Sequence, residues 1–497
     1  MIDTSKIDKR KPMHGTGKAR GCSHAKLGNF GRLFPHLKPQ AEQPCKGWDL
    51  TDPCVADEVS KLVGGAGGPM HDANGSSGDS ELPAAYTFFA QFVDHDVTLD
   101  TTTALRGGPE VPEKVPNLRT ASLDLDCVYG FGPEASPHLF DPAQDGRLLV
   151  GSRVDGVYRP NDVPRSSAGR ALIGDPRNDE NLFVSQMQLV FLRLHNRFLL
   201  RYGFEEAQRE TRFHYQYVVW NDFLRRVCDE DVWKFANAGL LAKKKKYPLC
   251  DIKDRCHGLF MPVEFSVAAF RFGHTTVRSS YPANLDFPSI ELFDERFGTE
   301  GFAPVPDELA VDWRTLLDLE PGFTFRRAKA FDQLLPDELI RMPDPVVGKR
   351  ADAAERSLAF RNLRRGIVLG LPSGQDVAQA LLKKGYGFKP ATTAQLFKEK
   401  GKPIPRWDCL PASLRACLEK HTPLFLYLML EARSLGKKER LGPVGSAILL
   451  EVFGAMLAHC ESYLTYTDDH GKGWSGPSPD ISPDPTLASL IRYAEGR

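Results

Sequence analysis

The sequence predicts a mainly α-helical chain with little β structure, forming a single large domain around a buried site. Helical patterns dominate after residue 80, and alternating strands are scarce. The 497 residues are 41% hydrophobic and 26% charged, so the chain can bury a large core. We expect this domain over residues 81–497. An irregular, partly flexible N-terminal arm over residues 1–80 is expected to precede it, because that segment is rich in Lys, Gly and Pro.

Four helical stretches are expected to build the core. The first spans about residues 86–97. The second follows Gly174-Asp175-Pro176 into SQMQLVFLRLHNRFLLRYG, which is apolar on most sides and should therefore be buried. A third spans about residues 263–278, and a fourth spans about residues 352–365 and ends at Gly366.

Charge and composition limit the classes of partner. Lys+Arg and Asp+Glu both number 64, and this balance argues against nucleic acid or a membrane surface. The one basic run, residues 243–246, is predicted to be a solvated loop. No stretch approaches the roughly 20 apolar residues of a membrane span, and the polar N-terminus shows no secretory signal. The ten cysteines are scattered singly, so free or structural thiols and a cytoplasmic location are expected, with secretion by another route left open.

The first helix carries an unusual polar cluster on an apolar background. Gln91, Asp94 and His95 are three and four residues apart, so they share one face, whereas Asp96 is turned about 100° from His95. Carboxylates and an imidazole on a buried helix are costly unless they are paired or bound to something. Alone, these residues fit an ion-paired structural cluster better than a functional site.

A second polar cluster, GDPRNDE, opens the most apolar helix. Arg177 and Glu180 are three residues apart and can face one pocket, although acids are also common at helix N-termini. Combined with His95, this cluster supplies what peroxide cleavage requires. A neutral histidine can move the proton from one oxygen to the other, and a fixed cation can stabilise the developing charge.

A third candidate is His274, in the apolar segment FRFGH, where the glycine permits close approach of a flat partner. A lone histidine on such a face is more commonly a core residue. As a haem ligand it would need its other ring nitrogen fixed by a hydrogen bond, and Asn362 in RNLRR offers a suitable amide. Arg365 could pair with a haem propionate.

The segment TASLDLD alternates oxygen-bearing residues with others. In an extended loop this spacing points Thr120, Ser122, Asp124 and Asp126 the same way. With Asp96 they form an oxygen-only set, the kind that Ca²⁺ prefers. A half-exposed edge strand explains the same alternation.

In their order along the chain, these motifs resemble the animal-type haem peroxidases of the peroxidase–cyclooxygenase superfamily, most closely its microbial members. The matching pieces are AQFVDHD, TASLDLD with VYG, GDPRNDE with LHNR, FRFGH, and RNLRRG with GLPSG. They cover about residues 86–374, and the tail from 474 to 493 is similar more loosely. The resemblance implies a haem b enzyme that reduces hydrogen peroxide and oxidises halides, thiocyanate or small aromatic donors.

The resemblance also implies a role for each matching residue. On the distal side of the haem, His95 matches the base, Arg177 the cation and Gln91 the distal glutamine. On the proximal side, His274 matches the iron ligand and Asn362 its hydrogen-bond partner.

Further matches concern attachment and metal binding. Asp94 and Glu180 match the carboxylates that form ester bonds to the haem in many members, and whether one, both or neither ester forms is left open. Arg271 and Arg365 would also bind the haem. The implied calcium ligands are Asp96, Thr120, Ser122 (through its carbonyl), Asp124 and Asp126.

Three departures from the family pattern bear on the haem linkage, the ion site and the choice between peroxidase and dioxygenase activity. Asn181 stands where a mammalian member has a haem-linked methionine, so that link should be absent. Asp126 replaces a serine and adds charge to the ion site. The Tyr-x-Trp-His motif of the family's fatty-acid dioxygenases has no match between His274 and Asn362, and Tyr281 could serve only in a different fold. We expect a haem peroxidase; the alternatives are a fatty-acid dioxygenase and a non-catalytic haem- and calcium-binding protein.

Overall fold

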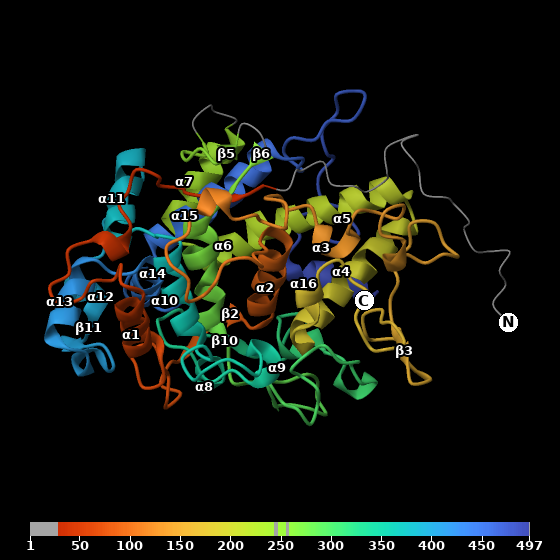
Figure 1. Cartoon of the computed structure of the whole chain (residues 1–497). Coiled ribbons are helices and arrows are strands. Elements are labelled where there is room, and N and C mark those ends of the chain that lie inside the picture. The colour runs from red at the N-terminus through yellow and green to blue at the C-terminus, as the bar shows by residue number, and fades with distance from the viewer. Residues whose placement is uncertain (1–27, 243–246, 255–257, 497) are drawn as a thin grey trace.

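The computed structural model describes residues 28–242, 247–254 and 258–496 (Figure 1). As the sequence predicts, it is mainly helical, and the sheets in these residues are all two-stranded. The helices are α1 (Pro53–Gly64), α2 (Ala85–Val97), α3 (Asp126–Tyr129), α4 (Leu182–Leu199), α5 (Phe204–Val218), α6 (Leu224–Val227), α7 (Glu230–Leu241), α8 (Asp337–Ile340), α9 (Asp344–Val347), α10 (Leu358–Val368), α11 (Gly374–Lys384), α12 (Thr393–Phe397), α13 (Ala412–Lys420), α14 (Leu424–Ser434), α15 (Pro443–His459) and α16 (Leu487–Glu495). The paired strands are β1 (Phe30–Gly31) with β7 (Met261–Pro262), β2 (Asp79–Pro83) with β10 (Arg327–Lys329), β3 (Ser152–Val154) with β4 (Val157–Arg159), β5 (Lys253–Asp254) with β6 (Gly258–Leu259), β8 (Ser280–Tyr281) with β9 (Ile290–Glu291), and β11 (Lys398–Glu399) with β12 (Lys402–Pro403).

Helix α2 lies near the centre of the molecule, with α4 and α16 on one side and α10 and α14 on the other (Figure 1). Every residue of α2 except Gln91 is buried. Its Phe92 ring stacks on Phe191 of α4, with 4.5 Å between ring centroids, and meets Tyr215 of α5 edge-on at 6.2 Å. Such aromatic pairs add to the stabilisation from burial itself. The predicted first helix is confirmed.

The predicted second helix is confirmed as α4, but it starts later than expected. Pro176–Asp179 forms a separate 3₁₀ turn, η5. Asn181 then accepts a hydrogen bond from Val184 N at 3.0 Å and caps a new helix. The break at Glu180 and Asn181 turns both side chains toward α2.

The third stretch is helical, but it is not a regular α-helix. Glu264–Ala268 forms a π-helical turn, η7, and Ala269–Thr276 forms a 3₁₀ segment, η8. Arg271 Nε donates to the Ser266 carbonyl at 2.7 Å, so a side chain satisfies a backbone acceptor that regular spacing would pair internally. The boundaries predicted for the fourth stretch are wrong. Helix α10 begins after its cap Ser357 and runs through Gly366.

Residues 28–80 are more ordered than the sequence predicts. They contain α1, whose Gly64 packs against α10 so closely that a Cβ there would lie 2.7 Å from Phe360 N. Ser357 Oγ donates a hydrogen bond to the Gly64 carbonyl, and this bond connects the end of α1 to the start of α10. The expectation of an irregular arm is therefore wrong for residues 53–64, while residues 1–27 lie outside the described structure.

Two further contacts hold the N-terminal part in place. Cys45 and Cys417 of α13 form a disulfide, so the expectation of free or structural thiols is wrong for this pair. The buried Glu264 carboxylate accepts hydrogen bonds from Leu33 N at 2.9 Å and Phe34 N at 3.1 Å. Residues 30–34 are thereby attached to the segment that carries His274.

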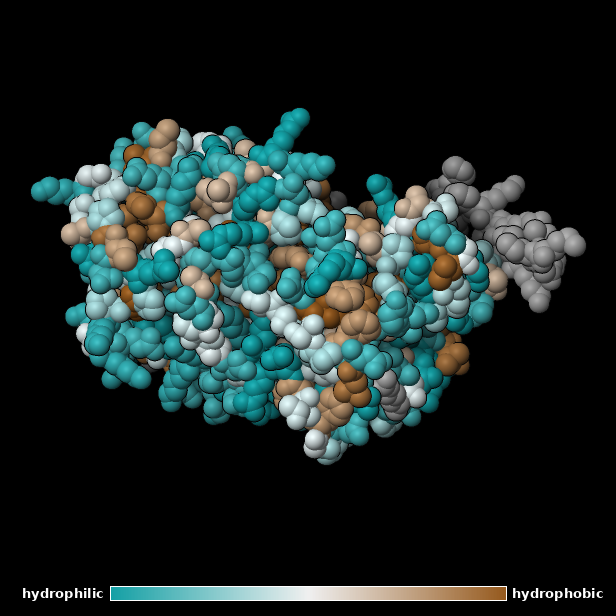
Figure 2. Space-filling model, turned by 90° about the horizontal axis from the view of Figure 1, so that it is seen from below, coloured by the Kyte–Doolittle hydropathy of each residue, from teal (hydrophilic) through white to brown (hydrophobic). Residues whose placement is uncertain are grey.

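The surface seen in Figure 2 is mostly hydrophilic, with apolar residues in small groups. Single exposed apolar residues are normal on a globular protein. No described helix is long and apolar enough to cross a membrane. The basic run at 243–246 lies outside the described residues.

Candidate functional site

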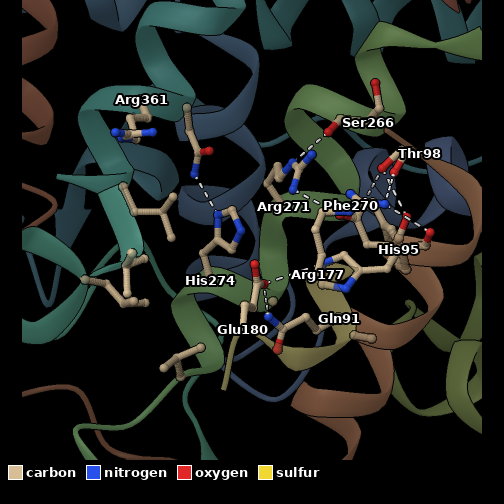
Figure 3. Close-up of a pocket in the computed structure, with 18 of the residues that line it drawn as sticks. Gln91, His95, Thr98, Arg177, Glu180, Ser266, Phe270, Arg271, His274 and Arg361 are labelled. Carbon is tan, nitrogen blue, oxygen red and sulfur yellow. Dashed lines mark hydrogen bonds and ion pairs between the residues drawn. The ribbon is translucent and has the colours of Figure 1, made fainter. Parts of the chain in front are cut away.

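A cavity of about 410 Å³ brings together side chains from α2, η5, η8 and α10. Figure 3 shows His274 on one side of the pocket and His95 with Arg177 on the other. Much of the lining is apolar and includes Phe88, Phe270, Leu292, Phe293, Leu358 and Leu369. Both predicted polar clusters and the predicted histidine thus face one space.

The tautomer of His95 is fixed by its neighbours. Asn178 Nδ2 donates to Gln188 Oε1 at 2.8 Å, which leaves Asn178 Oδ1 to face His95 Nδ1, also at 2.8 Å. Because an amide oxygen only accepts, Nδ1 must carry the proton. In the neutral ring the lone pair therefore lies on Nε2, and this atom is 3.4 Å from the Glu180 carboxylate. An imidazole held in this way can accept a proton at Nε2.

The Arg177 guanidinium is fixed by several bonds. Nε and Nη2 donate to the two Asp175 oxygens at 3.1 and 2.7 Å, and Nη2 also donates to the carbonyls of His95 and Thr98 at 3.1 and 2.7 Å. Burial would raise the pKa of Asp175, but its bonds to Arg177 and the nearby Arg119 hold it below the ordinary value, so the pair is ionised. Nη1 makes none of these contacts. The result is a rigid cation at the cavity wall.

Gln91 connects the two polar clusters. Its Nε2 donates to Glu180 Oε1 at 2.5 Å, and its Oε1 accepts from Asn181 Nδ2 at 3.2 Å. Burial acts to raise the pKa of Glu180, but the charge of His95 when its ring is doubly protonated, together with Arg177 and Gln91, outweighs burial and lowers the pKa overall. Glu180 is therefore an anion at neutral pH.

Asp94 lies on the same face of α2 as Gln91 and His95, and it forms an ion pair with Arg271 of η8. Its Oδ2 is 3.1 Å from Arg271 Nη1, and its Oδ1 accepts from Thr98 Oγ1 at 3.1 Å. Asp94, Glu180 and Arg271 all line the cavity. Neither carboxylate is unpaired.

His274 contacts Asn362 of α10, with 2.9 Å between Nδ1 and the amide group. The contact joins Nδ1 to Asn362 Nδ2, and a half-turn of the amide would present its oxygen to an Nδ1–H instead. Burial lowers the pKa of His274 to about 3, with the Arg271 charge adding to the effect, so the ring stays neutral. A neutral imidazole with one nitrogen held and the other facing a cavity suits a metal ion.

Cations surround the same side of the cavity. Arg365 Nη1 pairs with Asp100 Oδ2 at 2.7 Å. Arg361, to which the sequence analysis assigned no role, also lines the cavity. Within the described residues, its guanidinium donates one hydrogen bond, from Nε to the Glu355 carbonyl. Among the described residues Arg361 has no ion pair. Its position four residues before Arg365 was the available signal, because such residues share a helix face.

The predicted calcium residues converge on the other side of α2. Oxygens of Asp96, Asp124 and Asp126 all lie within 4.8 Å of one another, and Thr120 Oγ1 donates to Asp124 Oδ2 at 2.7 Å. Burial, and then the neighbouring Asp124, raises the pKa of Asp126 to about 8, and Asp96 shifts the same way. Ser122 is buried in the same loop. Asp96 and Asp124 are buried and Asp126 is half-buried. Three carboxylates this close together repel one another, so a cation would stabilise the group.

The dioxygenase alternative requires a tyrosine at the cavity. Tyr281 is buried, packs on Phe88 and Phe183, and its hydroxyl accepts from Arg278 N at 2.7 Å. Of the residues that the structure describes, no tyrosine lines the cavity. Tyr281 therefore does not supply the tyrosine that a dioxygenase would require at the cavity.

Comparison with known proteins shows the family of this chain. The family model for animal haem peroxidase matches residues 101–383, more than half of the chain. A peroxidase-like protein from Margaritifera margaritifera is 28% identical over 211 residues, which cover 38% of this chain and 25% of that protein. Thyroid peroxidase from Sus scrofa is 25% identical over 308 residues, covering 52% and 30%. The chain thus spans less than a third of the length of these two relatives.

Solved structures share the fold. Peroxidase A from Dictyostelium discoideum has a TM-score of 0.56 at 15% identity and covers 96% of this chain and 94% of its own. A fatty acid alpha-dioxygenase from Oryza sativa has a TM-score of 0.50 at 16% identity, covering 88% and 76%. Because both peroxidase and dioxygenase neighbours occur, the fold does not choose between the two activities. The family match and the shared fold place this chain in the animal haem peroxidase family of the peroxidase–cyclooxygenase superfamily.

Proposed function

We propose that this protein is a haem peroxidase that reduces hydrogen peroxide and oxidises a small donor such as a halide, thiocyanate or a phenol. One observation carries the proposal: a single cavity joins a base of fixed tautomer and a fixed cation with a neutral histidine on the other side. Haem bound there would supply the iron chemistry that splits the peroxide bond and oxidises the donor.

The residues present fit a haem. Gly273 lines the cavity, and a Cβ added to it would meet no atom within 4 Å, so glycine leaves room where a flat group would lie. His274 offers the iron a neutral nitrogen. Arg271, Arg361 and Arg365 would hold the two propionates.

Each polar residue of the other wall has a part in the reaction. His95 Nε2 would take the proton from the peroxide and return it to the departing oxygen, so that water can leave. As long as Glu180 is a free carboxylate it would stabilise the doubly protonated ring, and Asn178 would keep the Nδ1 proton in place. Arg177 would stabilise the negative charge on the departing oxygen, and Gln91 would orient the bound peroxide.

Two assays separate this function from its rivals. Haem-loaded protein should oxidise guaiacol when peroxide is added, and it should consume no oxygen with linoleate. Oxygen uptake with linoleate would favour the dioxygenase. A lack of activity with every donor, despite full haem content, would favour a non-catalytic haem- and calcium-binding protein.

Ester formation is the first structural consequence to test. Asp94 and Glu180 both reach the cavity, and an ester would neutralise each carboxylate while fixing the haem. Glu180 is ionised and can act as the attacking group. After peroxide treatment, we expect part of the haem to resist acid-acetone extraction and to migrate with the chain in denaturing electrophoresis.

The variants make this prediction specific. When both Asp94 and Glu180 are replaced by alanine, acid-acetone should extract all of the haem after peroxide treatment. Asp100→Asn is the matched control, since Asp100 lines the cavity but pairs with Arg365 and has no predicted ester. Full extraction of wild-type haem after repeated turnover would show that both residues are ordinary hydrogen-bonding carboxylates.

Calcium binding is the second structural prediction to test. We propose that Asp96, Asp124 and Asp126, with Thr120 and the Ser122 carbonyl, bind one Ca²⁺. Protein purified without chelator should contain about one Ca²⁺ per chain. Chelation should lower both the melting temperature and the peroxidase rate, because Asp96 adjoins His95, and added Ca²⁺ should restore them. Absence of the ion, with no effect of chelator, would make the loop purely structural.

A further inference from the structure

Three aromatic rings form a cluster at the surface, outside the cavity. Tyr217 of α5 lies 5.6 Å from Tyr463 and 6.4 Å from Trp474 between ring centroids, and Tyr463 lies 5.8 Å from Trp474. All three are partly exposed. In Figure 1 the C-terminal loop that carries Trp474 lies beside α5. We call these residues the α5 aromatic cluster.

Trp474 differs from the other partly exposed tryptophans of the described chain in the partner of its N–H. It donates to both Glu210 oxygens, at 3.1 and 3.2 Å. By contrast, Trp48 donates to a serine hydroxyl and Trp233 to a backbone carbonyl. A carboxylate at an indole N–H stabilises positive charge on the ring and can accept its proton. Burial raises the pKa of Glu210, which favours that transfer.

The opposite side of α5 leads to the cavity wall. Tyr215 is buried, and its hydroxyl donates to Asp96 Oδ2 at 3.1 Å. Asp96 directly follows His95, which lines the cavity. Tyr215 and Tyr217 are two residues apart, so their side chains leave α5 in nearly opposite directions. The diameter of a helix with its side chains is roughly 10–12 Å. Aromatic side chains therefore occur on both sides of the one helix between the cluster and α2.

We propose that Trp474 is a surface oxidation site for phenolic groups carried by molecules too large to enter the cavity. This inference rests on the proposed peroxidase function, since peroxide-oxidised haem is the oxidant. Trp474 gives one electron across α5 to the oxidised haem, and its indole proton moves to Glu210. A phenol then gives one electron to the Trp474 radical, the indole recovers its proton from Glu210, and the phenol proton leaves to solvent. Two such turns for each peroxide yield two phenoxyl radicals and two waters, because two protons taken up from solvent at the cavity balance the two that the phenols release.

The test uses tyramine coupled to dextran, with free tyramine as reference. For each haem-loaded protein, the rate with the polymer is divided by the rate with free tyramine. Trp474→Phe, which keeps an aromatic ring, should lower this ratio by about tenfold or more. Trp233→Phe is the matched control and should leave the ratio unchanged.

A second measurement needs haem and peroxide but no donor substrate. Protein treated with peroxide and a nitroso spin trap, without donor, should carry an adduct on the Trp474 peptide by mass spectrometry. Glu210→Gln should reduce that adduct. An unchanged ratio in Trp474→Phe, or an adduct-free Trp474, would overturn the surface site while leaving the peroxidase function intact. Failure of the wild type to oxidise free tyramine would overturn both.

Discussion

Replacing His274 by alanine is expected to strip the protein of most of its haem. Its ring is the neutral imidazole beside the cavity, held by Asn362 at 2.9 Å. Loss of a residue that only orients a metal ligand typically costs 10–100-fold in affinity, and loss of the ligand itself should cost more. Haem content per chain, measured as the pyridine haemochrome, tests this directly.

Two comparisons make the result specific to the iron bond. Added imidazole should partly restore the absorption spectrum of the alanine variant, because the cavity left by the ring can admit it. Asn362→Ala should keep more haem than His274→Ala but show a shifted spectrum, since it removes only the hydrogen bond. A His274→Ala protein with normal haem content and an unchanged spectrum would show that another group binds the iron.

His95→Ala is expected to retain haem but to react with peroxide about 10²–10⁴-fold more slowly, the usual loss for a general acid–base group. The Asn178 contact leaves Nε2 of His95 as the only ring atom able to accept a proton. Rapid-mixing absorption measurements at several peroxide concentrations give the rate, independently of any donor.

Asn178→Ala is the informative companion variant. It leaves the imidazole in place but frees the ring to adopt either tautomer, so a smaller loss is expected than in His95→Ala. Equal peroxide rates in the wild type and His95→Ala would assign the proton transfer to another group. Glu180, which lies 3.4 Å from Nε2, would then be the first candidate.

The sequence predicted the elements whose patterns are local. Helices α2 and α4 are strongly apolar over several turns, and their polar residues stand at spacings that force a shared face. The same spacing rule separated Asp96 from His95, and the structure places Asp96 with Asp124 and Asp126 on the other side. Helix α1 was missed because its segment is short and is flanked by glycine, proline and charge.

Other features depend on contacts between distant segments. The disulfide joins residues 372 positions apart, and no cysteine spacing marks it. The π turn before His274 and the 3₁₀ segment that contains it are accompanied by a hydrogen bond from Arg271 back to Ser266, which periodicity does not encode. The spacing within GDPRNDE marks Arg177 and Glu180 as neighbours on one face, but it does not single out Asn178. Its importance comes from the bonds to His95 and Gln188.

The cavity draws its walls from segments that are far apart along the chain, and this has a consequence for biosynthesis. Gln91 and Asn362 are separated by about 270 residues. At typical ribosomal speeds the second would follow the first by roughly 15–50 s. During that interval the nascent chain completes the distal wall at Glu180 and then adds His274, but it still lacks Asn362, so stable cofactor capture has to wait for α10. Supply of haem late in translation, or after release, therefore matters more for the yield of loaded protein than its supply at the start.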